Sequence, residues 1–164
     1  MVDVWVCNSS PLISLARIGR LDLIESLAAK ILVPDTVVRE IEAGGDRDSA
    51  AHAINASSRL QITADVDLPE AVRSWGLDPG ESQVLATASQ EPGCVVVLDD
   101  RAARRCAAAL SIPMVGTVGV VALARQRSTL KAAAPIYQAL RDAGLFLSPA
   151  LVKAVLVQFG EEPM

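Results

Sequence analysis

The stretch that decides the fold is Val95-Val-Val-Leu-Asp-Asp-Arg-Ala-Ala-Arg-Arg105. Its first four residues are all apolar, so a strand made of them would be buried on both faces, as in the centre of a parallel sheet. Two aspartates follow this strand directly, and a segment with helical periodicity follows them. The stretch therefore predicts an α/β sheet that carries acidic side chains at one edge.

Strand-like and helix-like segments alternate on either side of this stretch. The predicted strands are residues 2–7, 31–34, 60–63, 95–98 and 113–115. The predicted helices are residues 11–18, 20–29, 36–43, 48–57, 79–90, 101–110, 118–127, 132–143 and 149–159. This alternation predicts right-handed crossovers and a mostly parallel, about five-stranded sheet covered on both faces. Residues 44–49 are expected to form a mobile loop, and no linker indicates a second domain within residues 1–164.

Composition restricts the class of protein. The 164 residues allow one domain with a sizeable core, and the 3% aromatic content requires that core to consist of Ala, Val, Leu and Ile. Cys7, Cys94 and Cys106 are odd in number and lack paired spacing, so we expect buried thiols and neither disulfides nor a zinc site. No signal peptide or membrane-length apolar run is present, which favours the cytoplasm.

The net charge of −4 opposes general electrostatic binding of nucleic acid. A role on nucleic acid would therefore need a bound cation or a local arginine cluster.

Helix start signals indicate the direction of each helix. Ser10 before Pro11 has the pattern of an N-cap and first helical residue, as does Asp78 before Pro79. Asp78 and Glu81 also have the spacing of a capping box. In a parallel α/β sheet, helices begin at the edge where the preceding strands end, so these starts belong to one edge.

Four side chains are predicted to meet at that edge. Asn8 follows the first strand, Asp100 follows the strand at residues 95–98, and Glu81 lies in the first turn of its helix. Glu40 lies about one turn into the helix after the second strand, roughly 6 Å below the edge. Oxygen ligands of this kind suit Mg²⁺ or Mn²⁺ better than zinc.

Each acidic residue also has a purely structural interpretation when taken singly. Glu81 fits a capping-box carboxylate, Asp99 or Asp100 fits a helix N-cap, and Glu40 fits a solvated surface residue. The cluster favours function, because unrelated caps need not converge with a mid-helix glutamate. His52 is the only histidine and lies in a polar segment, so no Ser-His-Asp site is indicated. Phosphate-binding and dinucleotide-binding glycine motifs are absent from the sequence.

Five segments in order resemble VapC-like PIN-domain proteins, especially a poorly characterised bacterial subgroup. They are Val6-Cys-Asn-Ser-Ser-Pro-Leu-Ile-Ser-Leu-Ala-Arg-Ile-Gly-Arg-Leu21, Val33-Pro-Asp-Thr-Val-Val-Arg-Glu-Ile41, Leu77-Asp-Pro-Gly-Glu-Ser-Gln-Val-Leu-Ala86, Val97-Leu-Asp-Asp-Arg-Ala-Ala-Arg104 and Val115-Gly-Thr-Val-Gly-Val120. The resemblance implies a three-layer α/β/α sandwich and Mg²⁺- or Mn²⁺-dependent cleavage of phosphodiester bonds, usually in RNA. VapC-like members are commonly toxins that a small antitoxin holds in check.

The resemblance also implies roles for particular residues. The family's acidic positions fall, in order, on Asn8, Glu40, Glu81 and Asp100, with Asp99 as the alternate for the fourth. The nearby hydroxyl position falls on Ser10. This sequence departs from the pattern at Asn8, which offers a neutral oxygen, and at Leu98, where many relatives carry a hydroxyl residue.

The expected function is a metal-dependent endoribonuclease, the toxin of a toxin–antitoxin pair, with a small antitoxin and a homodimer as expected partners. Arg101, Arg104 and Arg105 lie beside Asp100 and are expected to contact the RNA backbone. One alternative is a PIN-fold module that binds RNA or protein without cleaving, which Asn8 favours. Another is a different metal-dependent phosphohydrolase such as a phosphatase, which would need an aspartate nucleophile where Asn8 stands.

Overall fold

The computed structural model describes residues 3–44 and 49–164. Its centre is a five-stranded sheet in the order β3-β2-β1-β4-β5, and all four strand pairs are parallel. The strands are β1 Val4–Cys7, β2 Lys30–Pro34, β3 Leu60–Thr63, β4 Val95–Val97 and β5 Met114–Val115. The predicted parallel α/β sheet is confirmed.

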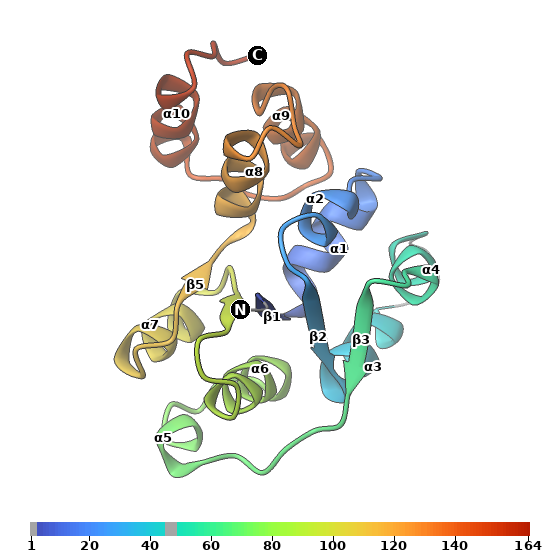
Figure 1. The fold of residues 1–164 in the computed structure, drawn as a ribbon, viewed down its shortest axis with the longest axis vertical. Helices are drawn as coiled ribbons and strands as arrows, with labels where there is room; N and C mark the ends of the chain where they lie inside the picture. The colour runs from blue at the N-terminus through green and yellow to red at the C-terminus, as the bar shows by residue number, and fades with distance from the viewer. Residues whose placement is uncertain (1–2, 45–48) are drawn as a thin grey trace.

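Helices connect the strands and cover the sheet. They are α1 Ser9–Arg17, α2 Asp22–Glu25, α3 Asp35–Ala43, α4 Ser49–Ala56, α5 Glu70–Arg73, α6 Pro79–Ser89, α7 Arg101–Ala109, α8 Thr117–Gln126, α9 Ala134–Asp142 and α10 Pro149–Gln158. Figure 1 shows β1 between α1 and α6, while α8, α9 and α10 gather at one end. Among the described residues, no helix is long and apolar enough to cross a membrane.

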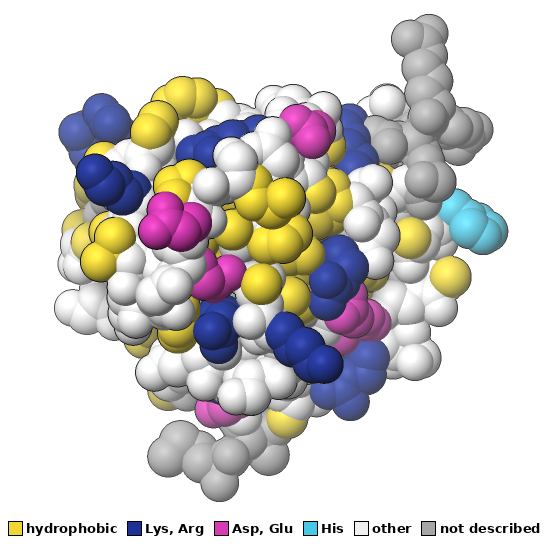
Figure 2. All heavy atoms as spheres, turned by 90° about the horizontal axis from the view of Figure 1, so that it is seen from above, with side chains coloured by type: hydrophobic (Ala, Val, Ile, Leu, Met, Phe, Trp, Pro, Cys, Tyr) yellow, Lys and Arg dark blue, Asp and Glu magenta, His cyan; other side chains and the backbone are white. Residues whose placement is uncertain are grey.

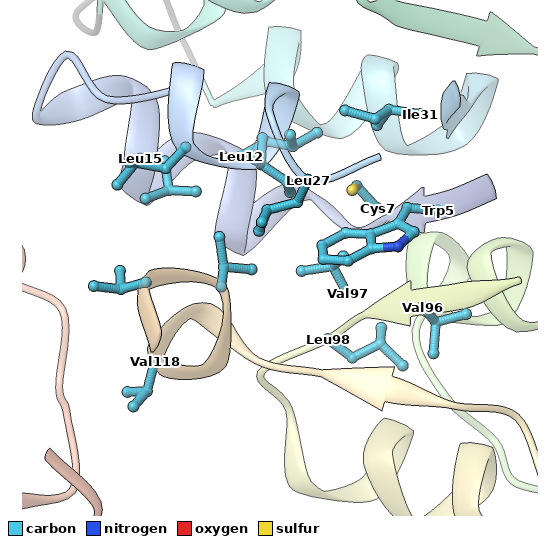
Figure 3. Packing of buried hydrophobic residues seen from close by; sticks show 14 of the residues in the cluster. Trp5, Cys7, Leu12, Leu15, Leu27, Ile31, Val96, Val97, Leu98 and Val118 are labelled. Carbon is cyan, nitrogen blue, oxygen red and sulfur yellow. The ribbon is translucent and has the colours of Figure 1, made fainter. Parts of the chain in front are cut away.

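The buried core holds the central strands side by side. Val96, Val97 and Leu98 are fully buried, which confirms the prediction that this strand is buried on both faces. Figure 3 shows Trp5 of β1 beside Val97 of β4. Burying a large apolar side chain stabilises a fold by roughly 1.5–3 kcal/mol. This packing therefore helps to hold β1 and β4 in their places in the sheet.

The three cysteines were correctly predicted to be small buried residues. Cys7, Cys94 and Cys106 are all buried and free. Burial raises the pKa of the Cys7 thiol well above its usual range, so the thiol stays protonated.

The predicted start of the first helix was wrong. Helix α1 begins at Ser9, one residue before the predicted cap Ser10, and Asn8 occupies the N-cap position without a side-chain capping bond. The backbone N–H of Asn8 donates to the Val97 carbonyl at 3.2 Å, so the chain stays extended and bonded to β4 one residue beyond β1. Pairing with β4, which local sequence does not reveal, therefore sets where α1 begins.

Two further differences concern helix length. The helix predicted at residues 20–29 shortens to α2, and beyond its end the carbonyls of Leu27 and Ala28 accept hydrogen bonds from Arg127 and Arg59. The single turn α5 was not predicted, and buried Val72 anchors it. Of the loop predicted at residues 44–49, positions 45–48 lie outside the described residues.

Candidate metal centre

The predicted site residues lie at the carboxyl edge of the sheet or in the first turns of the helices that begin there. Strands β1, β2 and β4 all end at this edge because they are parallel, and α1, α3 and α7 begin there. Asn8 follows β1, and Asp100 caps α7 shortly after β4. Helix α6 contacts β1, β2 and β4 and also packs against α3, which carries Glu40.

The first turn of α6 is formed by Asp78-Pro-Gly-Glu81, and its residues contribute to the turn in different ways. Asp78 is the N-cap, and its Oδ1 accepts the Glu81 backbone N–H at 3.0 Å, so the predicted helix start is confirmed. Pro79 lacks an N–H and has a backbone angle suited to the first helical position. The Gly80 N–H donates to Oε1 of Glu40 at 2.9 Å, which ties α3 to α6 across 40 residues of sequence.

Gly80 makes the approach of Glu40 possible. A Cβ atom added at Gly80 would lie 2.8 Å from Cδ of Glu40, closer than real Cβ contacts allow. Residue 80 therefore has to be glycine for the Glu40 carboxylate to reach the helix N-terminus. The requirement is one of space, since a side chain would occupy the place of that carboxylate.

Glu81 is the most perturbed acid at this edge. Its side chain is buried, at 6% exposure, and Oε2 has no hydrogen-bond partner. Burial is the main cause that raises the pKa of Glu81 to about 9, followed by hydrogen bonding and charge repulsion from Asp78 and then from Asp100. Without a cation, Glu81 is therefore protonated at neutral pH.

Glu40 belongs to the same group of charges. Burial raises the pKa of Glu40, the Gly80 N–H opposes that rise, and the charge of Asp78 adds to it. We call Glu40, Asp78, Glu81 and Asp100 the acidic cluster. Sequence reasoning treated Asp78 only as a helix cap. The capping-box spacing already put Asp78 and Glu81 on one helical turn, but the sequence did not show that the charge of Asp78 acts on Glu81.

Asp100 has a structural role as well as a place in the cluster. Its Oδ2 accepts the Ala103 N–H at 3.0 Å, so it caps α7. The charge of the same carboxylate also contributes to the raised pKa of Glu81. The capping interpretation is therefore confirmed for Asp100, and its charge also acts on Glu81.

Asp99 is held away from the cluster by a different helix. Its Oδ1 accepts the Thr117 N–H at 2.7 Å, and its Oδ2 accepts the Thr117 hydroxyl at 2.6 Å. Both oxygens are therefore engaged at the start of α8. Between the two adjacent aspartates, the structure brings Asp100 and not Asp99 to Glu81.

Asn8 presents a second buried oxygen without a partner. The side chain is 7% exposed, and its Oδ1 has no hydrogen-bond partner. An unsatisfied buried polar atom costs about 1–3 kcal/mol. Asn8 and Glu81 thus each carry an oxygen that a bound cation would satisfy. A third such atom, Thr87 Oγ1, lies two turns further along α6, away from the edge.

The predicted substrate-binding residues lie on two sides of this edge. Ser10 is half-buried and lines a pocket of 310 Å³ between α1 and the end of α9. Arg101, Arg104 and Arg105 of α7 line a pocket of 330 Å³ that also includes Met114. Nη1 of Arg104 donates to the Leu98 carbonyl at 3.0 Å, so Arg104 is partly engaged in the fold, whereas the other two arginines are exposed.

The chemistry of these residues suits a hydrated Mg²⁺ or Mn²⁺ ion. Within residues 3–44 and 49–164, no three acidic, histidine or cysteine side chains are arranged to hold one ion directly. Mg²⁺ commonly uses only one or two protein carboxylates and keeps several waters. All donors at this edge are oxygens, and Oε2 of Glu81 is without a partner, so the residues fit such an ion and do not fit zinc.

Comparisons with known proteins agree with this fold. The solved structure described as "Structure of the PIN domain endonuclease Utp24" is similar in fold, with a TM-score of 0.53 and 13% sequence identity. The similarity covers 69% of this chain and 84% of that one. No curated protein sequence matches the chain. Residues 4–161 match the PIN-domain family designated DUF3368, and the chain therefore belongs to that family, whose fold is one of metal-dependent nucleases.

Proposed function

We propose that this protein is a divalent-metal-dependent endoribonuclease that hydrolyses RNA phosphodiester bonds at the acidic cluster. One observation carries the proposal. Glu81 is buried, its Oε2 has no hydrogen-bond partner, and the charges of Asp78 and Asp100 raise the pKa of its carboxyl. Without a cation this arrangement keeps Glu81 protonated, because like charges at short range disfavour ionisation, whereas a bound cation would favour the ionised carboxylate. Its occurrence in a PIN domain favours metal-dependent nuclease chemistry over a purely structural role.

The four predicted ligands would hold the ion in different ways. Glu81 is the principal ligand, because its Oε2 has no competing partner. Asp100 contributes from the α7 cap, and Asn8 contributes a neutral carbonyl oxygen. Glu40 acts through water, because the Gly80 N–H already occupies its Oε1. A bound Mg²⁺ or Mn²⁺ would lower the pKa of a coordinated water and stabilise charge on the phosphate.

The arginines of α7 supply the positive charge that the chain as a whole lacks. Arg101 follows Asp100 directly in sequence, and together with Arg104 it lines a pocket beside Asp99 in which a phosphate would be held. The Ser10 hydroxyl would contact the RNA backbone on the other side of the cluster. A local cluster of this kind accounts for RNA binding by a protein whose net charge is −4.

We further propose that the protein is the toxin of a toxin–antitoxin pair, on the basis of its resemblance to VapC-like proteins. Exposed apolar side chains near α10 support a protein partner, with Phe146 at 84%, Leu151 at 51% and Val157 at 67% exposure. Figure 2 shows the end of the molecule where α9 and α10 lie, with apolar atoms in the middle and charges of both signs around them. Light scattering of the purified protein at tens of micromolar, alone and with a small protein encoded nearby, tests for a homodimer or an antitoxin complex.

A nuclease assay tests the central proposal. Metal-free protein is incubated with a mixed RNA pool, with and without Mn²⁺. We expect metal-dependent cleavage by the unaltered protein and by the control Glu42→Gln, which changes an exposed acid on α3. We expect no cleavage by Glu81→Gln or Asp100→Asn. Cleavage that survives both of these changes would contradict the proposed site.

Asn8 keeps one alternative open, namely a PIN module that binds RNA without cleaving it. Asn8 brings no charge to the site, which disfavours tight metal binding. RNA binding without cleavage at any Mn²⁺ concentration would support this alternative.

A further inference from the structure

Two helices carry predicted site residues, α3 with Glu40 and α6 with Glu81, and the segment that follows β3 is hydrogen-bonded to both of them. We infer that Asp65 and Gln83 are positioning residues, which hold α3 against α6 so that the Glu40 carboxylate stays at the first turn of α6. Only the consequence of this positioning for metal binding rests on the proposed function.

Helix α3 begins without a cap of its own. Its N-cap position is occupied by Pro34, whose side chain has no hydrogen-bonding atom, so the first N–H groups of α3 lack a local acceptor. Asp65, 29 residues away from Thr36, takes this part, and its Oδ1 accepts the Thr36 N–H at 3.0 Å. Its Oδ2 accepts hydrogen bonds from the Thr36 hydroxyl and, at 2.9 Å, from Nη2 of Arg39. Asp65 therefore caps α3 from outside the helix.

The residue after Asp65 is bonded to α6. Oε1 of Gln83 accepts the Val66 N–H, and Nε2 of Gln83 donates to the Val66 carbonyl, both at 2.9 Å. One side chain of α6 thus satisfies both backbone polar groups of Val66. Figure 1 shows the chain leaving β3 near α3 and passing α6 on its way to α5.

Together with the bond between Glu40 and Gly80, these contacts close a ring. Asp65 is bonded to the start of α3, and four residues beyond Thr36 the same helix carries Glu40. Oε1 of Glu40 accepts the Gly80 N–H at 2.9 Å, and α6 then leads to Gln83, which is bonded back to the neighbour of Asp65. A single bond between two helices lets them shift, whereas a closed ring holds their separation.

The ring lies at the carboxyl edge of the sheet. Strand β3 is parallel to β2, and Thr63 at its end is paired with Pro34, directly before α3. The segment that contains Asp65 therefore leaves the sheet where the predicted site residues lie.

The Glu40 carboxylate occupies a place that its charge disfavours. Burial and the charge of Asp78 both raise the pKa of Glu40, and the hydrogen bond from Gly80 opposes them. A movement of α3 away from α6 would return the carboxylate to water, where it is better solvated. Asp65 and Gln83 oppose that movement, because it would stretch the bonds at Thr36 or at Val66.

An NMR titration of the metal-free protein tests the ring. The Gly80 amide donates to Glu40, so its chemical shift should follow the ionisation of that carboxyl as the pH is raised. We expect Asp65→Ala and Gln83→Ala each to reduce this pH-dependent shift at least about twofold, because the carboxylate then spends less time at the amide.

Two further variants distinguish positioning from a general loss of stability. Asp65→Asn keeps a good capping side chain and should retain most of the Gly80 titration. The control Asp67→Ala removes an exposed aspartate of the same segment and should change nothing. An unchanged titration in both Asp65→Ala and Gln83→Ala would overturn the inference, and so would an equal loss in Asp67→Ala.

A double-mutant cycle tests the consequence for metal binding. Calorimetry at pH 7 should show Mn²⁺ binding weakened about tenfold by Asp65→Ala, as is typical when the support of a metal-binding group is removed. In a Glu40→Ala background the same change should have no further effect, because Asp65 acts through Glu40. Equal weakening in both backgrounds would contradict this route. If the unaltered protein binds no Mn²⁺, the proposed function fails, and the Gly80 titration alone decides the positioning role.

Discussion

Binding of a metal ion should release a proton from Glu81. The pKa of Glu81 is about 9 in the metal-free protein, above pH 7, so most of these carboxyls carry a proton there. A cation binds the ionised form, so about one proton should leave for each ion bound. Mn²⁺ affinity should accordingly rise about tenfold, or about 1.4 kcal/mol, for each pH unit between pH 6 and pH 8, and level off near pH 9.

Calorimetry measures this proton directly. Titrations of Mn²⁺ at pH 7 in two buffers with different ionisation enthalpies give the number of protons released. Glu81→Gln should bind Mn²⁺ weakly and release no proton. If the unaltered protein releases no proton, or if the pH slope is the same in Glu81→Gln, then Glu81 is not the titrating ligand and the reasoning is refuted.

The same shift in pKa makes the stability of the metal-free protein depend on pH. The folded pKa of Glu81, about 9, lies above its ordinary value of 4.5. Between these values the folded protein binds a proton that the unfolded chain has lost, so the free energy of unfolding falls as pH rises. Thermal melts in chelator should therefore show higher stability at pH 6 than at pH 8, and Glu81→Gln should flatten that difference.

Three further changes probe the edge of the sheet. Mg²⁺ or Mn²⁺ should raise the melting temperature, and the double variant Glu81→Gln with Asp100→Asn should abolish that rise; an unchanged rise would contradict the site. Asn8→Asp should tighten Mn²⁺ binding about tenfold, near 1.4 kcal/mol, and slightly lower metal-free stability through repulsion. Lost stability with unchanged affinity would place Asn8 outside the metal centre. Gly80→Ala should cost about 1–3 kcal/mol in urea denaturation, because the added methyl group displaces the Glu40 carboxylate and breaks its hydrogen bond from the residue 80 N–H. A neutral result would mean that Glu40 is free to move away.

The sequence by itself determined those features that depend on neighbouring residues. Val95 to Leu98 are apolar in succession, and this alone indicated a central parallel strand. Asp78 followed by Pro79 marked a helix start correctly, because the cap bonds within its own turn. The parallel order of strands then required Glu81 and Asp100 to return to one edge, although 19 residues separate them in sequence.

Only the tertiary structure decided the features that depend on distant partners. Local sequence put a cap at Ser10, but the bond from Asn8 to Val97 moved the start of α1. Asp99 and Asp100 are adjacent and chemically identical, and they are distinguished by Thr117, which takes both oxygens of Asp99.

The composition of the acidic cluster was decided in the same way. Glu40 joins the first turn of α6 through the N–H of Gly80, 40 residues away. The raised pKa and partnerless oxygen of Glu81 come from burial, and burial depends on what the rest of the chain packs around a group. Short-range patterns specify which groups are present and in which direction each element runs. The energy of a buried charge depends on every atom within a few ångströms, and the sequence alone does not list those atoms.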